Sequence, residues 1–475
     1  MSSPERTTVR GWLRDVRAAL AGNTHDHTSG RLGRALTLLA VPMVLEMVME
    51  SIFAVVDIYF VSQVGPEAVA AVGLTESVIT LVYAVAIGLA MATTATVARR
   101  VGEGRDADAS RAAWQALLLG LGVSAVLGCL GWFFADDLLG FMSRSDDAAD
   151  AARVVEVGSG YTRIALTANV VIMLLFLQNA VFRGAGDAVL AMRRLWLANG
   201  INLVLDPCLI FGLGPFPEMG VTGAATATVI GRGCGVAYQH IALRRGVGRI
   251  RLDPTAATID LATMGKLLRV SAGGIGQFLV ATSSWIVLMK VMAQFGSQAL
   301  AGYTVAVRVV MFALLPSWGL ANAAATLVGQ NLGANKPERS ERAVYLAGKA
   351  NTVVLACITV LFVWKAEAIV GLFGGEPPVV AVGAQALRIM SLGYVAYAWG
   401  MVLCQAFNGA GDTGTPTKLN LICFWLLQIP VAYGLATHTS LGPAGVFWAV
   451  TGSEAVLTLL SLWLFRRGRW RSVQV

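Results

Sequence analysis

The chain has 475 residues, of which 56% are hydrophobic and only 13% are charged, and its mean hydropathy is +0.67. Soluble domains carry about 25% charged residues, so this composition excludes an ordinary soluble enzyme or binding module. The formal net charge of +8 does not indicate a nucleic-acid binder, because the basic residues lie in short loops between apolar runs. The chain is therefore predicted to be an all-α membrane protein.

Taken in chain order, the apolar runs predict twelve transmembrane helices, each long enough to cross a hydrocarbon core that needs about 20 residues. They cover residues 35–62, 68–98, 113–135, 153–182, 190–213, 219–243, 264–294, 298–330, 343–365, 380–407, 416–436 and 442–465.

These spans divide the chain into two predicted lobes of six helices each. We expect a cytoplasmic N-terminal segment over 1–34, an N-lobe over 35–250, a linker over 251–263, a C-lobe over 264–465 and a basic tail over 466–475. Apolar and basic residues alternate near the N-terminus, which is typical of a helix lying on the membrane surface.

Basic residues are concentrated in every second loop, and the loops between them are nearly neutral or acidic. The basic loops include those near Arg105, Arg249 and Lys336, and Arg183 and Arg194 are assigned to another. Because basic loops stay in the cytoplasm, both termini are expected there, in an integral protein of the plasma (inner) membrane. No cleavable signal is evident, since the first apolar run contains Glu46 and Glu50.

An internal repeat relates the two predicted lobes. The segment 64–70 matches 295–301, and Gly102 matches Gly333, both at an offset of 231 residues. The segment 182–187 matches 407–412 in five of six positions, at an offset of 225. Because each half has an even number of spans, both halves enter the membrane in the same direction, which predicts a pseudo-two-fold axis along the membrane normal and a cavity between the lobes.

Acidic residues inside the predicted spans are the strongest candidates for function, because a charge at a helix centre costs about 2.5–3.5 kcal/mol on insertion scales. Glu46, Glu50 and Asp57 lie on one stripe of the first span, and Asn199, Asn202 and Asp206 share a face of the fifth. Such stripes predict a site that binds and releases a proton or cation. The alternative is that these groups only hydrogen-bond neighbouring helices.

Other intramembrane polar groups are weaker signals. Asn179 in the fourth span, with Thr226 and Thr228 in the sixth, is a candidate to complete a coordination shell, although interhelical hydrogen bonding explains such residues equally well. The six cysteines and four histidines lack the spacing of a disulfide framework or zinc site, so no cofactor is expected.

Several motifs occur together, in order and at matching spans. They are Pro42 with Asp57 fifteen residues later, Val64-Gly65, Gly88-Leu89, the paired Gly-Ala-Gly-Asp loops ending at Asp187 and Asp412, the segment 202–207, and the segment 223–228. In these residues the chain resembles the multidrug and toxic compound extrusion (MATE) transporters of the multidrug/oligosaccharidyl-lipid/polysaccharide flippase superfamily, over about residues 35–465.

The resemblance implies a V-shaped fold and antiport, in which a small drug-like molecule leaves the cell while protons or sodium ions enter. In the branch that couples through the N-lobe, the ion site corresponds to Asp57, Asn202, Asp206 and Thr228 here, with Thr226 as the alternative threonine. This chain has Glu50 where that branch usually has a glutamine, so we add Glu50 to the coupling group. As substrate-cavity candidates we take Glu46, Met47, Asn179, Asn199 and Thr226.

We therefore predict a monomeric antiporter in the lipid bilayer that exports small organic compounds and is not an enzyme. The N-lobe cavity reads as acidic, which favours cationic or zwitterionic cargo. Two alternatives remain: a flippase for a lipid-linked or other anionic substrate, and an intramembrane enzyme that uses paired carboxylates.

Overall fold

The computed structural model describes residues 9–22, 25–64, 66–142, 148–253 and 258–474, and within these ranges it contains helices and no β-strand. The first half of the chain forms α1 (Val9–Ala21), α2 (Leu32–Ser62), α3 (Pro66–Gly102), α4 (Asp106–Met142), α5 (Ala148–Thr167), α6 (Asn169–Ala185), α7 (Ala188–Phe211) and α8 (Val221–Arg245). The second half forms α9 (Leu261–Ala293), α10 (Ser297–Gly333), α11 (Pro337–Gly371), α12 (Pro377–Leu392), α13 (Tyr394–Ala410), α14 (Gly414–Asn420), the π-helix η2 (Leu421–Gln428), α15 (Ile429–His438), α16 (Pro443–Arg466) and the short 3-10 helix η3 (Arg469–Ser472).

The predicted fold class is confirmed. In the described part of the chain, ten helical segments are long and apolar enough to cross a membrane, or eleven if α12 and α13, which bend by 59° at their junction, form one span. The remaining predicted span, 219–243, corresponds to α8, which is not among them because it is rich in glycine and threonine and carries Arg232, Gln239 and His240.

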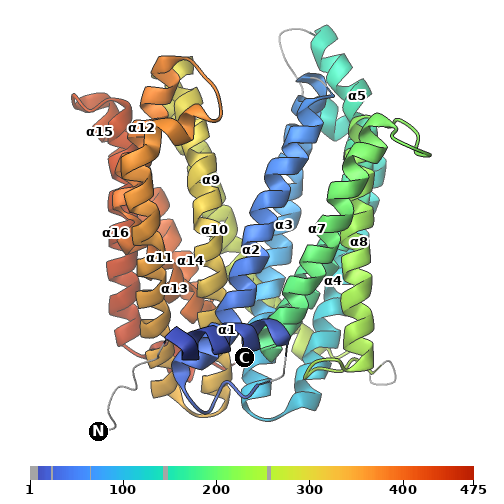
Figure 1. Cartoon of the computed structure of the whole chain (residues 1–475), viewed down its shortest axis with the longest axis vertical. Coiled ribbons are helices and arrows are strands. Elements are labelled where there is room, and N and C mark those ends of the chain that lie inside the picture. The colour runs from blue at the N-terminus through green and yellow to red at the C-terminus, as the bar shows by residue number, and fades with distance from the viewer. Residues whose placement is uncertain (1–8, 23–24, 65, 143–147, 254–257, 475) are drawn as a thin grey trace.

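The helices form two groups that meet at the end of the molecule where α1 lies and diverge towards the opposite end, as Figure 1 shows. Helices α2 and α3 of the first group contact α9 and α10 of the second. The two groups of helices therefore form a V whose closed end lies beside α1.

Glycines make the closed end of the V possible, and they do so symmetrically. A Cβ added to Gly88 in α3 would lie 2.8 Å from the backbone nitrogen of Ile275 in α9, and one added to Gly319 in α10 would lie 2.8 Å from Cα of Val44 in α2. These two contacts are related by the 231-residue offset found in the sequence. Close helix approach through small residues is a common solution inside a bilayer, where apolar side chains gain nothing by leaving lipid.

The repeated Gly-Ala-Gly-Asp segments are helix ends. Gly186 and Gly411 cap α6 and α13 in the left-handed conformation, with φ of 91° and 90°. In each copy the following aspartate nitrogen donates to the phenylalanine carbonyl five residues earlier, at 2.8 Å for Asp187 and 2.9 Å for Asp412. Only glycine takes this conformation without strain, which gives the motif a structural reason in both lobes.

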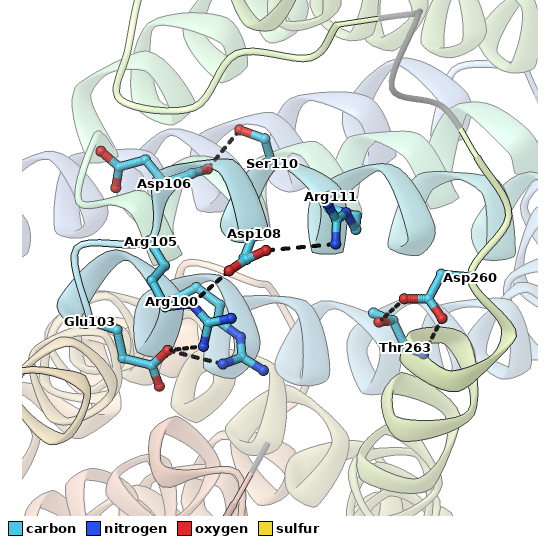
Figure 2. Close-up of polar contacts among 9 residues, drawn as sticks. All are labelled: Arg100, Glu103, Arg105, Asp106, Asp108, Ser110, Arg111, Asp260 and Thr263. Atoms are coloured by element: carbon cyan, nitrogen blue, oxygen red, sulfur yellow. Dashed lines mark hydrogen bonds and ion pairs between the residues drawn. The ribbon is translucent and has the colours of Figure 1, made fainter.

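Ion pairs and caps hold the loops at the closed end. Figure 2 shows Arg105 paired with Asp108 at 2.6 Å and Arg100 paired with Glu103 at 2.9 Å around the turn from α3 to α4. Asp260 caps α9 by accepting hydrogen bonds from the backbone of residues 262 and 263. The arginines that mark this loop as basic are therefore largely compensated by neighbouring acids.

Segments from both ends of the chain cross between the lobes at the closed end. Arg339 of α11 donates to the carbonyl oxygen of Ser29 at 2.8 Å, while His27 lies 3.4 Å from the carbonyl oxygen of Gly186 at the end of α6. Near the other terminus, Arg99 of α3 donates to the carbonyl oxygen of Val473 at 2.6 Å. These contacts tie the two lobes together on this side.

Candidate functional site

Glu46 lies on α2 and is almost completely buried, with 1% of its surface exposed. Arg183 of α6 forms an ion pair with its Oε1 at 2.5 Å, and Asn179, one turn earlier on α6, donates to the same oxygen at 3.0 Å. Gln239 of α8 in turn donates to the amide oxygen of Asn179 at 2.7 Å. Residues of α6, supported by Gln239 of α8, thus hold this carboxylate of α2 in one orientation.

Glu50 lies one turn further along α2 and is partly exposed. Its partners are Arg232 of α8 at 3.6 Å and the side-chain nitrogen of Asn199 on α7 at 3.5 Å. Arg232 also donates to the hydroxyl of Tyr83 at 2.9 Å and lies over the ring of Phe53. Contacts of this length hold a partly exposed carboxylate only weakly.

The predicted cluster in the fifth and sixth spans forms within the N-lobe. Asn202 donates to Asp206 Oδ1 at 3.2 Å and to the hydroxyl of Thr228 at 3.1 Å, and Asp206 is fully buried. Thr226 does not join this cluster, because its hydroxyl donates to Thr222 within its own helix. The side chain of Asp57 lies outside the described residues, although its backbone continues α2.

A cavity opens between the lobes, with an empty volume of about 1190 Å³ including its mouth. The predicted residues Glu46, Met47, Glu50 and Asn179 line its N-lobe wall. The C-lobe wall carries Trp318 and a chain of amides formed by Asn322, Gln405 and Asn408. Asn199 and Thr226 are not among the lining residues.

A second cavity lies inside the N-lobe and shares part of its wall with the first. Glu50, Tyr83 and Arg232 line both, and Thr228 lines the second. The Glu50–Arg232 pair therefore stands between the space that separates the lobes and the polar cluster around Asp206.

The cavity inside the N-lobe is lined by Glu50, Glu76 and Arg232, but the cavity between the lobes is not acidic. Among the described residues that line the cavity between the lobes, the charged side chains are Glu46 and Glu50 together with Arg183, Arg194 and Arg232. The prediction that Arg183 and Arg194 lie in a loop is wrong. Because α6 continues to Ala185 and α7 begins at Ala188, both arginines are helical, and both line the cavity. Arg194 and Arg232 lie inside predicted spans, so the rule that selected the acids would have selected them too.

One buried carboxylate in the C-lobe also escaped the sequence analysis. Glu454 of α16 is 7% exposed and lines a small cavity with Tyr394 and Tyr397. Gly220 and Gly442 precede the last span of each lobe, with φ of 56° and 54°, and they are 222 residues apart. At the same offset, Glu454 of the C-lobe is the repeat equivalent of Arg232 of the N-lobe. The repeat thus puts opposite charges at equivalent positions.

Two helical lobes with a charged cavity between them at the apex of a V form the architecture of a membrane transporter and not of an enzyme. A model of the MatE family matches residues 42–208 and 274–434, which is more than half of the chain and covers both lobes. The chain therefore belongs to the MatE family.

Individual relatives agree with this assignment. The chain is similar to a probable multidrug resistance protein NorM of Thermotoga maritima, with 24% identity over 92% of this chain and 93% of that protein. A FAD transporter of Shewanella oneidensis is 26% identical over 93% of this chain and 96% of its own length. Among solved structures, the outward-facing conformation of a multidrug resistance MATE transporter superposes with a TM-score of 0.86 at 25% identity, covering 99% of this chain and all of that one.

Proposed function

We propose that the protein is a multidrug antiporter that exports small organic compounds in exchange for protons or sodium ions. The observation that carries this proposal is the cavity at the apex of the V, which both lobes line and whose N-lobe wall contains the buried carboxylate of Glu46 and the partly exposed carboxylate of Glu50. The names of the multidrug relatives support the same function.

The cavity between the lobes is where we place the cargo. Because its lining combines two acids with three arginines, it suits compounds that carry charges of both signs rather than simple cations. Trp318, Phe176 and Met47 provide apolar area for the body of such a molecule.

The coupling ion is proposed to bind at Asp57, Asn202, Asp206 and Thr228, with Glu50 linking this site to the cargo cavity. The contacts among Asn202, Asp206 and Thr228 support it, because a carboxylate oxygen and a hydroxyl oxygen both accept from the same amide nitrogen and therefore lie close together. Oxygen ligands of these kinds suit a hard cation. A proton would need only one of the carboxylates.

We place both termini in the cytoplasm and the protein as a monomer in the plasma membrane. The basic loops near Arg105 and Lys336 lie at the closed end of the V, so the V opens to the outside in this conformation. Single cysteines introduced near Arg249 and exposed to an impermeant thiol reagent test this orientation, and labelling from outside would reverse it.

The experiment that tests the function uses the full chain in proteoliposomes loaded with one cationic and one zwitterionic fluorescent dye. A proton gradient and a sodium gradient are imposed separately, with the Asp206→Asn variant and protein-free liposomes as controls. Antiport predicts dye movement that follows at least one gradient in the wild type alone. Dye movement equal to that of empty liposomes under both gradients contradicts the proposal.

The three arginines favour one second candidate, a flippase for a lipid-linked anionic substrate. A flippase moves its cargo only with its lipid anchor in the bilayer. Gradient-driven efflux of water-soluble dyes therefore separates the two functions.

A further inference from the structure

Arg194 of α7 is the most unusual charged residue in the cavity. Its side chain is 0% exposed, yet it lines the space between the lobes. Among the described residues, none of its Nε, Nη1 and Nη2 atoms has a hydrogen-bond partner. A buried guanidinium has five N–H donors, and leaving them unsatisfied is costly.

The neighbouring charges do not neutralise Arg194. The charged side chains that interact with it electrostatically are Glu46, Glu50, Arg183 and Arg232. The two acids already pair with the other two arginines, at 2.5 Å for Glu46 with Arg183 and 3.6 Å for Glu50 with Arg232. The described cluster thus contains three arginines and two acids, and Arg194 is the arginine that forms no ion pair within it.

The fold makes room for this side chain. Gly235 of α8 faces it, and a Cβ at that position would lie 2.7 Å from Arg194 Cδ. The glycine at this position leaves space for the arginine side chain to lie buried against α8. Arg194 is therefore not an arginine that extends along lipid to reach the membrane surface.

We propose that Arg194 binds an oxyanion, a carboxylate or a phosphate, carried by an aromatic cargo molecule; this proposal rests on the transport function proposed above. The planar guanidinium offers two parallel N–H groups to either oxyanion. Phe176 and Tyr83 on the N-lobe wall and Trp318 on the C-lobe wall provide the faces against which an aromatic body packs. Cargo would then supply the counter-charge that the described cluster around Arg194 lacks.

Pairs of fluorescent probes that differ only in the oxyanion test this proposal on the purified full chain in detergent. Flavin mononucleotide and riboflavin share one ring system and differ by a phosphate. 7-Hydroxycoumarin-3-carboxylate and its carboxamide differ by a carboxylate. Fluorescence anisotropy gives the affinity for each, and the pair that shows a preference tells which oxyanion the site takes.

We expect the wild type to bind the anionic member of at least one pair ten times more tightly than its neutral partner, which corresponds to about 1.4 kcal/mol. Arg194→Gln should reduce this preference to about twofold or less. The matched control is Arg193→Gln, because the adjacent arginine is exposed and donates to the carbonyl oxygen of Leu20 instead. This control should keep the full preference.

A wild type without preference in either pair, or a preference that persists in Arg194→Gln, overturns the proposal. If Arg194→Gln is not recovered as a folded protein, Gly235→Ala decides in the same way, since it displaces the guanidinium and keeps every charge. Ion-driven dye efflux without any oxyanion preference would refute this site alone. An oxyanion preference without efflux would refute only the transport function.

Discussion

The crossing of α3 and α10 at the closed end of the V provides the sharpest test of alternating access. Gly102 and Gly333 end these two helices and face each other: a Cβ on Gly102 would overlap the carbonyl oxygen of Gln330, and one on Gly333 would overlap that of Arg99. Alanine at both positions therefore cannot be accommodated unless the backbones move apart.

Overpacking of this kind costs about 1–3 kcal/mol. The cost applies only to the conformation in which the two helix ends touch, so the double variant should shift the equilibrium towards the oppositely open state by about 5- to 150-fold. The expected effect is a change in populations with little loss of folded protein.

Spin labels on Ser77 of α3 and Ser283 of α9 report this change, because Ser77 is exposed and Ser283 is partly exposed, one on each arm of the V. Pulsed electron–electron double resonance measures the distance between the two labels. In the Gly102→Ala, Gly333→Ala variant, the fraction of molecules with a shorter distance should increase. Gly122→Ala in α4 is the matched control, since a Cβ there meets nothing within 4 Å. Distance distributions identical in all three proteins would refute the reasoning.

Three further predictions concern charged groups. Asp206→Asn should abolish ion-driven dye efflux while dye binding persists, because an amide keeps the shape but cannot titrate; efflux at the wild-type rate would remove Asp206 from the coupling site. Glu50→Gln should shift the pH optimum of efflux, since Arg232 loses its counter-charge at 3.6 Å, and superimposable rate profiles would leave Glu50 a packing role. At the closed end, burial raises the pKa of Asp187 from 3.8 to about 6 although the backbone of Arg249 donates to it. The folded state then holds this proton more tightly than the unfolded state, so stability falls by about 3 kcal/mol as pH rises from about 4 to about 6, and Asp187→Asn should abolish that slope in thermal unfolding measured from pH 4 to 7.

The sequence alone determined the membrane class, the helical lobes and their relation. Apolar length is a local property, and the bilayer requires each spanning segment to satisfy its own backbone hydrogen bonds, so spans are readable without knowledge of their neighbours. The repeat offset also predicted that Gly102 and Gly333 are equivalent, and in the structure these two glycines contact each other. The grouping of Asn202 with Asp206 was also readable, because residues four apart share a helix face.

Only the tertiary structure decided the electrostatic character of the cavity. Whether Arg183 and Arg194 extend into a loop or into the space between the lobes depends on where α6 and α7 end and on which helix each side chain faces, and span boundaries cannot be read to within a turn. The pairing of Glu46 with Arg183 joins residues 137 positions apart, and that of Glu50 with Arg232 joins residues on α2 and α8. The charge of a cavity wall is a sum over helices that meet only after packing. The sequence therefore shows that Arg194 lies within a span, but only the packed structure shows that no acid pairs with it.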